Sequence, residues 1–141
     1  KVYNDQWMLE RGFLDVKTFK DLVSGRGTQR LINLKKTDTV ADAIELMKKY
    51  DIENIPVMDN ETSVGAISAG GLFNKILNNP DIKTQTVESV MEKPYPEVAF
   101  ETPVERLSSF ITKENGAVLS KDESGSIHIV TKYDIIQSLT K

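Results

Sequence analysis

Short apolar runs alternate with helical apolar spacing through the first half of this 141-residue chain. A short apolar run predicts a buried strand, whereas apolar residues three and four positions apart predict an amphipathic helix. In chain order these patterns predict a strand, a helix, two strands and a helix, at residues 31–34, 40–49, 55–58, 64–68 and 72–77. The first half is therefore expected to fold in the order β-α-β-β-α, with Thr39 as the cap of its first helix.

The same order returns in the second half of the chain at an offset of 64 or 63 residues. Its strands are expected at residues 97–100, 116–120 and 126–130. Thr102, Pro103 and Glu105 have the order of a capping box with proline in the first helical position, so a helix is expected from Val104 to Ile111. Because a unit of about 50 to 60 residues buries little apolar surface alone, the two repeats are expected to share one core and pack as one α/β unit.

Two shorter helical patterns precede the first repeat. One carries Trp7, and the other carries Phe19 and Val23 before the Ser-Gly-Arg-Gly breaker at residues 24–27. A tryptophan needs burial, so Trp7 is predicted to pack against the repeats or a partner chain. A linker and a short helix at residues 87–91 are expected to join the two repeats.

The stretch Ile127–Leu139 carries the most informative polar residues, because a strand runs directly into a helix at Thr131. Thr131 and Asp134 form the T-x-x-D pattern of a capping box, in which each side chain satisfies a free backbone N–H. The same hydroxyl and carboxylate stand at a helix N-terminus, which favours an anionic ligand group, and Asp134 is placed to accept hydrogen bonds from ribose hydroxyls. Taken alone, these residues favour the capping interpretation, and the internal repeat of the chain shifts the balance toward the ligand interpretation.

Composition excludes several classes of function. The hydrophobic share of 39% and the charged share of 28% are typical of a soluble globular protein, and no apolar run reaches the roughly 18 residues of a membrane-spanning helix. With no cysteine and only His128, the chain has no disulfide, and no metal site is expected. The net charge of −3, with dispersed basic residues, argues against nucleic acid as a partner.

Other motifs bear on enzyme activity and on the origin of the chain. We expect no enzyme activity, because the chain has no cysteine nucleophile, no G-x-x-x-x-G-K loop and no histidine pair for acid–base work. The absence of disulfides fits the cytoplasm. Because the chain begins with Lys1 and no signal peptide follows, it is expected to be a piece of a longer cytoplasmic protein.

Two tandem units with I-P-V-M-D at residues 55–59 and I-V-T-K-Y-D-I at 129–135 resemble a pair of CBS domains, the Bateman module. The lead-in N-D-Q-W-M-L-E-R-G-F-L, residues 4–14, resembles the segment that joins the catalytic core of cystathionine β-synthase to its C-terminal CBS pair. The resemblance implies the regulatory region of such an enzyme, with pyridoxal phosphate only in the missing catalytic domain. It divides the chain into a helical lead-in and two CBS repeats, at residues 1–28, 29–79 and 80–141.

CBS pairs offer two pseudo-symmetric clefts for adenosine-containing ligands, and the resemblance implies the residues of each cleft. One cleft would be lined from both repeats, by Leu31, Ile32, Ile52, Asn54, Ile55, Ile129, Thr131, Tyr133 and Asp134. Its apolar residues would sandwich an adenine, although isoleucines at these spacings more often simply fill a core. His128 and Lys132 flank this cleft and would favour phosphate, although each residue alone is better interpreted as a strand histidine and a solvated lysine.

The second cleft departs from the family pattern. It would be formed by Ser68, Gly70, Asn115 and Ala117. Gly71 stands where the ribose-binding aspartate is expected, so this cleft is predicted to bind weakly or to stay empty.

The sequence and the resemblance leave two candidate functions for the chain. The first is a sensor of S-adenosylmethionine or of AMP, ADP or ATP that controls its own catalytic domain allosterically. The alternative is a structural module with empty clefts that pairs subunits as a homodimer.

Overall fold

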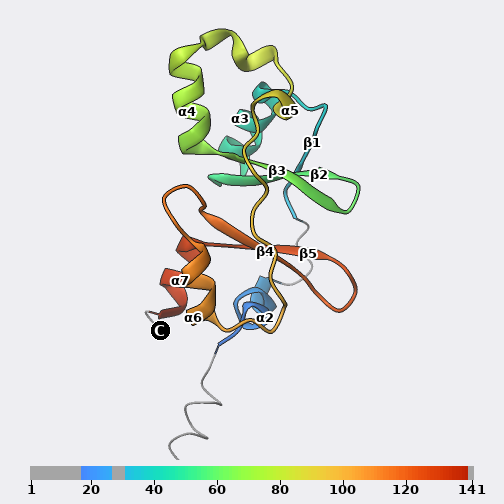
Figure 1. Cartoon of the computed structure of the whole chain (residues 1–141), viewed down its shortest axis with the longest axis vertical. Coiled ribbons are helices and arrows are strands. Elements are labelled where there is room, and N and C mark those ends of the chain that lie inside the picture. Colours follow the sequence, from blue (N-terminus) through green and yellow to red (C-terminus); the bar gives the residue numbers. More distant parts are fainter. Residues whose placement is uncertain (1–16, 27–30, 140–141) are drawn as a thin grey trace, which may run out of the picture.

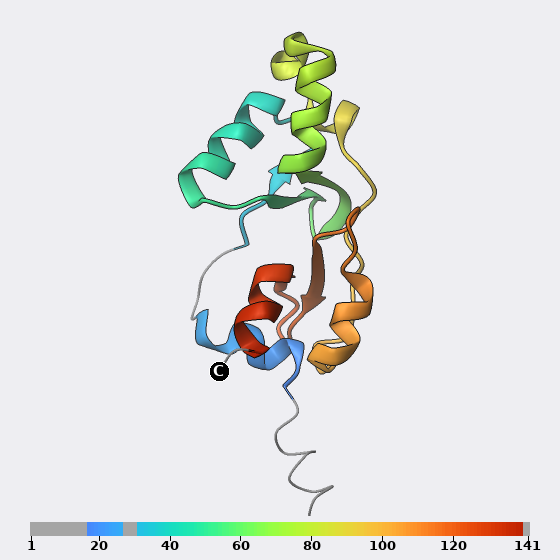
Figure 2. The ribbon, with the colours of Figure 1, turned by 90° about the vertical axis from the view of Figure 1, so that its left-hand side faces the viewer.

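The computed structural model describes residues 17–26 and 31–139, which form a mixed α/β fold with two β-sheets (Figure 1). The sheets lie next to each other in the middle of the molecule, and helices lie on their outer sides in both views (Figures 1 and 2). The predicted α/β fold of two tandem repeats is confirmed.

The first repeat has the predicted order of elements. It consists of β1 (Leu34–Lys35), α3 (Val40–Tyr50), β2 (Asn54–Asp59), β3 (Thr62–Ser68) and α4 (Ala69–Asn78). β1 is parallel to β2, and β2 is antiparallel to β3. Thr39 caps α3 in a capping box with Asp42, because each side chain accepts a hydrogen bond from the backbone N–H of the other residue. The predicted cap is confirmed.

The first strand is shorter than predicted, because it begins at Leu34 rather than at Leu31. Leu34 pairs with Val57 in the parallel ladder. The β2 residue before Val57 is Pro56, which has no N–H to donate, so the ladder does not extend back along residues 31–33. This segment is left without a strand partner and runs along the space between the repeats.

The second repeat keeps the predicted strand pair but differs in its first strand and first helix. Its elements are α6 (Val104–Leu107), the 3₁₀ turn η3 (Ser108–Phe110), β4 (Ala117–Lys121), β5 (Ile127–Thr131) and α7 (Lys132–Leu139). β4 and β5 are antiparallel. The strand predicted at 97–100 is wrong: a single bridge joins Glu97 to Leu119, since Pro96 next to it has no N–H to extend a ladder.

The capping box predicted for the first helix of the second repeat is also wrong. Pro103 occupies the cap position without a side-chain hydrogen bond, and the Thr102 hydroxyl donates instead to the carbonyl of Ala99 at 2.6 Å. The α-helix stops after one turn. The hydroxyls of Ser108 and Ser109 bond back to carbonyls three residues earlier, which competes with continued helix formation.

The lead-in segment packs on the second repeat. It forms α2 (Phe19–Val23), as predicted, and the 3₁₀ turn η1 (Ser24–Arg26). The backbone N–H of Phe19 donates to Thr102, and that of Val104 donates to Lys17, both at 2.8 Å. The helix predicted around Trp7, and the predicted burial of that residue, lie outside the described residues.

Side chains alternate across each strand and divide the apolar residues into three clusters. The outer face of the first sheet packs with α3 and α4 through residues that include Leu34, Val40, Ala43, Ile55, Val57, Ile67 and Leu72. The outer face of the second sheet packs with α2, α6 and α7 through Phe19, Val23, Val104, Leu107, Val118, Val130 and Ile135. Ala66, Tyr95, Ala117 and Leu119 join the two repeats. The expectation of one shared core is therefore wrong, because each repeat has its own core and only this third cluster is shared.

The segment after α4 packs on the first repeat. It forms the 3₁₀ turn η2 (Pro80–Thr84) and α5 (Val87–Val90), close to the short helix that the sequence predicted. Ile82 and Val87 are buried in the apolar cluster of the first sheet, although the sequence division groups this segment with the second repeat. By its packing, the segment up to the end of α5 therefore belongs with the first repeat.

Candidate functional site

A cavity of about 1200 Å³ lies between the two repeats. Ten residues of the two predicted clefts line it: Leu31, Ile32, Ile52, Asn54, Ser68, Gly70, Ile129, Thr131, Tyr133 and Asp134. The structure thus brings eight of the nine residues predicted for the first cleft, and two of the four predicted for the second, to the wall of one cavity. Ile55 and Ala117 are fully buried in the apolar clusters, and neither they nor Asn115 line the cavity.

The N-terminus of α7 places Thr131 and Asp134 on the cavity wall. An Asp134 carboxylate oxygen accepts from the Thr131 N–H at 2.8 Å and from the Thr131 hydroxyl at 3.1 Å. The N–H of Asp134 in turn donates to that hydroxyl at 3.5 Å. This is the reciprocal capping geometry that the T-x-x-D pattern predicts. The hydroxyl and the carboxylate remain at the cavity surface, where a ligand can reach them.

Arg26 brings a positive charge from the lead-in segment to the same carboxylate. One guanidinium nitrogen lies 2.8 Å from the carboxylate oxygen of Asp134, and the other donates to the backbone carbonyl of Ile129. The side chains of Arg26 and Asp134 are each 28% exposed. The sequence reasoning missed Arg26 as a site residue, because residues 24–27 signal only a chain break. Its contact with Asp134 follows from the tertiary fold.

Glu92 places a second carboxylate at the N-terminus of α4, the helix of the first repeat that corresponds to α7 of the second. The Ser68 hydroxyl donates to this carboxylate at 3.2 Å and accepts from the N–H of Gly71 at 3.1 Å. Glu92 also lines the cavity. No local motif in the sequence marks it, because it lies 24 residues from Ser68.

Asn54 is fixed between the two repeats at the cavity wall. The phenol of Tyr95 donates to the Asn54 side-chain oxygen at 3.1 Å, and a Cβ on Gly116 would lie 3.1 Å from that oxygen. Burial, followed by the charge of Glu92, raises the pKa of Tyr95 well above its usual range. Tyr95 therefore stays a neutral donor at physiological pH, and it holds the Asn54 amide in one orientation.

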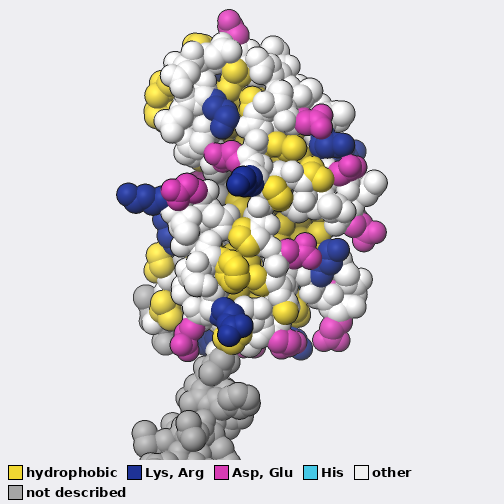
Figure 3. Space-filling model, viewed as in Figure 1, with side chains coloured by type: hydrophobic (Ala, Val, Ile, Leu, Met, Phe, Trp, Pro, Cys, Tyr) yellow, Lys and Arg dark blue, Asp and Glu magenta, His cyan; other side chains and the backbone are white. Residues whose placement is uncertain are grey.

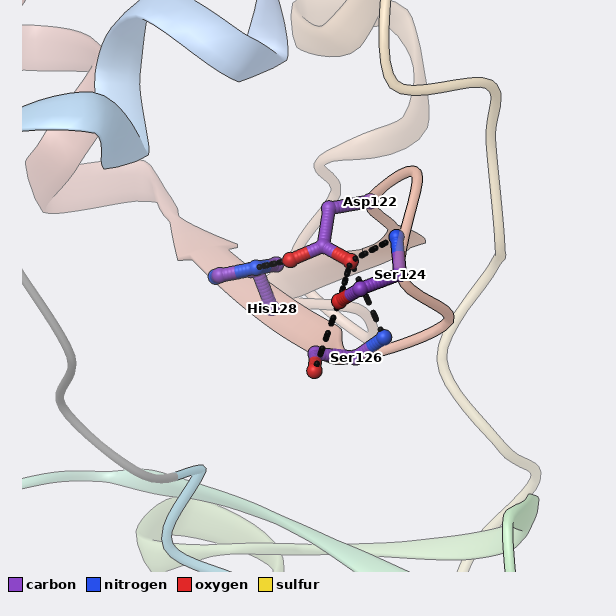
Figure 4. A network of polar contacts seen from close by, with 4 residues as sticks. All are labelled: Asp122, Ser124, Ser126 and His128. Carbon is purple, nitrogen blue, oxygen red and sulfur yellow. Dashed lines mark hydrogen bonds and ion pairs between the residues drawn. The ribbon is translucent and has the colours of Figure 1, made fainter.

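His128 is part of the cavity wall and is held by the turn between β4 and β5 (Figure 4). Its ring nitrogen lies 2.8 Å from Asp122, whose other oxygen accepts from Ser124 and Ser126. The hydrogen bond from His128, followed by that from Ser124, holds the pKa of Asp122 well below its usual range. The Asp122 carboxylate therefore fixes both the turn and the imidazole.

Because the pKa of Asp122 is lowered in the folded protein, its contribution to stability is present above the ordinary aspartate pKa of about 3.9 and declines as pH falls below that value. We expect Asp122→Asn to lower stability at pH 5 and the gap from wild type to narrow toward pH 2.5. Urea unfolding at a series of pH values measures this. Glu123→Gln, an exposed change in the same turn, is the control, and a gap that stays constant with pH would disprove the assignment.

The charged residues that line the cavity are more acidic than basic. Five carboxylates belong to Asp51, Glu53, Glu92, Glu114 and Asp134, whereas three basic side chains belong to Arg26, Lys113 and Lys132. Among the described residues, no group of three or more His, Cys, Asp or Glu side chains is arranged to hold a metal ion. No helix in residues 17–26 or 31–139 is long and apolar enough to cross a membrane.

Comparison with known sequences finds a matching family model and two relatives. Residues 20–78 match the family model of the CBS domain. The whole chain is 26% identical to part of cystathionine beta-synthase from Dictyostelium discoideum, over 162 residues. A 115-residue alignment, with 76% of the chain, is 31% identical to inosine-5'-monophosphate dehydrogenase from Methanocaldococcus jannaschii. The chain spans 32% and 21% of the lengths of these two relatives.

Solved structures with a similar fold include CBS domains. The CBS domain NE2398 superposes with a TM-score of 0.78 at 20% identity, covering 89% of this chain and 99% of that one. The CBS domain pair of protein MJ0100, in complex with 5'-methylthioadenosine and S-adenosyl-L-methionine, has a TM-score of 0.72 at 21% identity and coverage of 89% and 97%. CBSX2 in complex with AMP has a TM-score of 0.62 at 24% identity and coverage of 80% and 90%.

Proposed function

We propose that this chain, which contains a CBS domain and has the fold of a CBS-domain pair, is a regulatory module that binds an adenosine-containing ligand between its repeats. The observation that carries the proposal is the cavity of about 1200 Å³ with Thr131 and Asp134 on its wall. Related folds were solved with AMP and with S-adenosyl-L-methionine, which supports an adenosyl ligand here.

The lining residues provide for each part of such a ligand. The apolar side chains of Ile52 and Ile129 would contact the adenine faces, and the Asn54 amide would contact the polar edge of the ring. The carboxylate of Asp134 would accept from the ribose hydroxyls, with Thr131 beside it. The ligand must share or replace the contact between Asp134 and Arg26, so binding has an energetic cost at that ion pair.

The charge of the cavity favours a cationic adenosyl ligand over a polyphosphate. Five carboxylates face three basic side chains along its wall. S-adenosylmethionine has a net positive charge, because its sulfonium and ammonium groups outweigh its single carboxylate, and such a surface attracts it, whereas ATP brings several negative charges. We therefore expect the cavity to bind S-adenosylmethionine more tightly than AMP, and AMP more tightly than ATP.

The partner that such a module controls is a catalytic domain of the cystathionine β-synthase type. The alignment over the whole chain with the Dictyostelium discoideum enzyme supports this, as does the position of the lead-in before the repeats. Pyridoxal phosphate would belong to that catalytic domain. The module can be docked on the catalytic domain or released from it. A ligand that binds one of these two states more tightly shifts the equilibrium between them, typically by about 1–3 kcal/mol.

Thermal unfolding with added ligand tests the proposal. A ligand that binds only the folded chain stabilises it by about 2.7 kcal/mol at 100 times its Kd. We expect S-adenosylmethionine to raise the unfolding midpoint in a concentration-dependent way, and free methionine, the control, to leave it unchanged. A midpoint that none of S-adenosylmethionine, AMP and ATP raises would contradict the proposal and would favour a structural module.

We also propose that two copies of the chain pair through α4 and α7. Both helices lie on the same side of the molecule, at the left of Figure 1 and toward the viewer in Figure 2. Hydrophobic side chains reach the surface along that edge (Figure 3). The large ones that are more than half exposed are Phe73, Leu77, Tyr133, Ile136 and Leu139. Because α4 and α7 are corresponding helices of the two repeats, this face has an approximate two-fold axis. Such a face can pair with the same face of a second copy.

Light scattering with size-exclusion chromatography tests the pairing. We expect a dimer for the wild-type chain and a monomer for the double variant Phe73→Glu, Ile136→Glu, because each charge would be buried in the contact. Tyr50→Glu, an equally drastic change on the exposed part of α3, should leave the dimer intact. A wild-type chain that stays monomeric at the highest concentration measured would exclude this pairing.

A further inference from the structure

The 3₁₀ turn η1 is attached to the cavity wall through one side chain. In the described chain, the hydrogen bond and the ion pair that join η1 to the second repeat both come from Arg26, which contacts the carbonyl of Ile129 and the carboxylate of Asp134. No residue of η1 is buried. The attachment of this turn therefore depends on Arg26.

The helix before the turn is held more firmly. Phe19 and Val23 of α2 are buried in the apolar cluster of the second sheet. The backbone N–H groups of Phe19 and Lys20 donate to carbonyls of the second repeat, at 2.8 and 3.0 Å. A partly exposed ion pair contributes far less to stability than a buried aromatic side chain. Loss of the Arg26 contacts would therefore release η1 and leave α2 in place.

Three donors share one carboxylate oxygen of Asp134. Oδ2 accepts from the N–H and the hydroxyl of Thr131 and lies 2.8 Å from the guanidinium of Arg26. A carboxylate that binds two neighbouring ribose hydroxyls uses both of its oxygens, and each oxygen has about two lone-pair directions. A bound ribose therefore has to displace a donor from Oδ2. The Thr131 contacts are part of the helix cap, whereas Arg26 reaches the oxygen on a long side chain from a turn without buried residues, so Arg26 is the donor that leaves.

We propose that an adenosyl ligand, by binding Asp134 through its ribose, displaces Arg26 and releases η1 from the second repeat. The inference rests on the proposed function and adds the structural change that the ligand causes. The turn follows α2 in the chain and precedes the first repeat, so its release loosens the connection between α2 and that repeat. Because coupling between two binding events is reciprocal, the attachment of η1 weakens ligand binding by the same factor as the ligand weakens the attachment.

A nitroxide label at residue 25 measures the release of η1 by electron paramagnetic resonance. The chain has no cysteine, so Gly25→Cys gives a single attachment point, and a Cβ at Gly25 would have no atom within 4 Å. We expect slow label motion in the free chain and faster motion with S-adenosylmethionine, whose binding to the labelled protein is measured by titration. The same label at Glu61→Cys, in the exposed turn between β2 and β3, is the control and should give one spectrum in both states.

Arg26→Gln tests whether the release acts through this side chain. The labelled variant should show fast motion without ligand and no further change with S-adenosylmethionine. The unlabelled variant should bind S-adenosylmethionine about two- to fivefold more tightly than the wild-type chain, because no ion pair has to be broken.

Two results would overturn this inference and leave the proposed function intact. One is S-adenosylmethionine binding that does not change the spectrum of the residue-25 label. The other is binding to unlabelled Arg26→Gln that is no tighter than binding to the wild-type chain. Absence of S-adenosylmethionine binding to the wild-type chain would instead overturn the proposed function, and this inference with it.

Discussion

Replacing Phe19 by alanine is expected to lower the free energy of unfolding by about 3–5 kcal/mol, as for other large aromatic deletions in packed cores. Phe19 is fully buried in the cluster of the second sheet, and its ring lies 6.0 Å from that of Phe100. Backbone hydrogen bonds to Thr102 and Phe100 hold the start of α2 in place. The neighbouring core residues would therefore only partly fill the space that the deleted ring leaves.

Urea unfolding of the chain measures this loss. Leu22→Ala is the matched control, because Leu22 lies on the same helix but is only partly buried, so its loss should be clearly smaller. A loss below about 1 kcal/mol for Phe19→Ala would mean that α2 does not pack as an integral part of the second repeat. The result also bears on function, because α2 sets the position of Arg26.

Asp134→Asn is expected to reduce the affinity for the adenosyl ligand about tenfold or more. In the proposed site the carboxylate accepts from the ribose hydroxyls, and charge-assisted hydrogen bonds are roughly twice as strong as neutral ones. The change also removes the partner of Arg26, so part of any effect would come from the ion pair. Titration at equal folded fraction, compared with Arg26→Gln, separates the two causes.

Arg26→Gln keeps the Asp134 carboxylate and removes the cation that competes for it. We therefore expect this variant to bind the ligand at least as tightly as the wild-type chain. If Asp134 acted only as a cap and as the partner of Arg26, the two variants would change affinity equally, or neither would change it. Either outcome would remove Asp134 from the site.

The first repeat was predictable from the sequence because its local signals agree with its packing. Thr39 and Asp42 form the capping box that their spacing predicts, and the apolar runs of β2 and β3 are buried. The second repeat has weaker agreement. Thr102 matches the cap pattern but bonds to Ala99, because Pro103 takes the cap position. A threonine hydroxyl can cap the following helix or bond to a nearby backbone carbonyl, so residue spacing alone does not predict which contact it makes.

The candidate site divides in the same way. The contact of Thr131 with Asp134 is local, so its spacing predicts it. Arg26 reaches Ile129 across 103 residues, and Glu92 reaches Ser68 across 24, so each depends on how the segments pack. Gly71 illustrates the consequence: the sequence indicates a missing carboxylate, whereas the structure places the carboxylate of Glu92 beside it.

Isothermal titration of the wild-type chain with S-adenosylmethionine, AMP and ATP shows whether the cavity between the repeats binds an adenosyl ligand. The proposed cavity predicts saturable binding of S-adenosylmethionine, with a lower Kd than that of ATP, because the wall carries five carboxylates against three basic groups. Saturable heat should also be absent with free methionine. A folded chain that shows no saturable binding of any of the three ligands would contradict the proposed function.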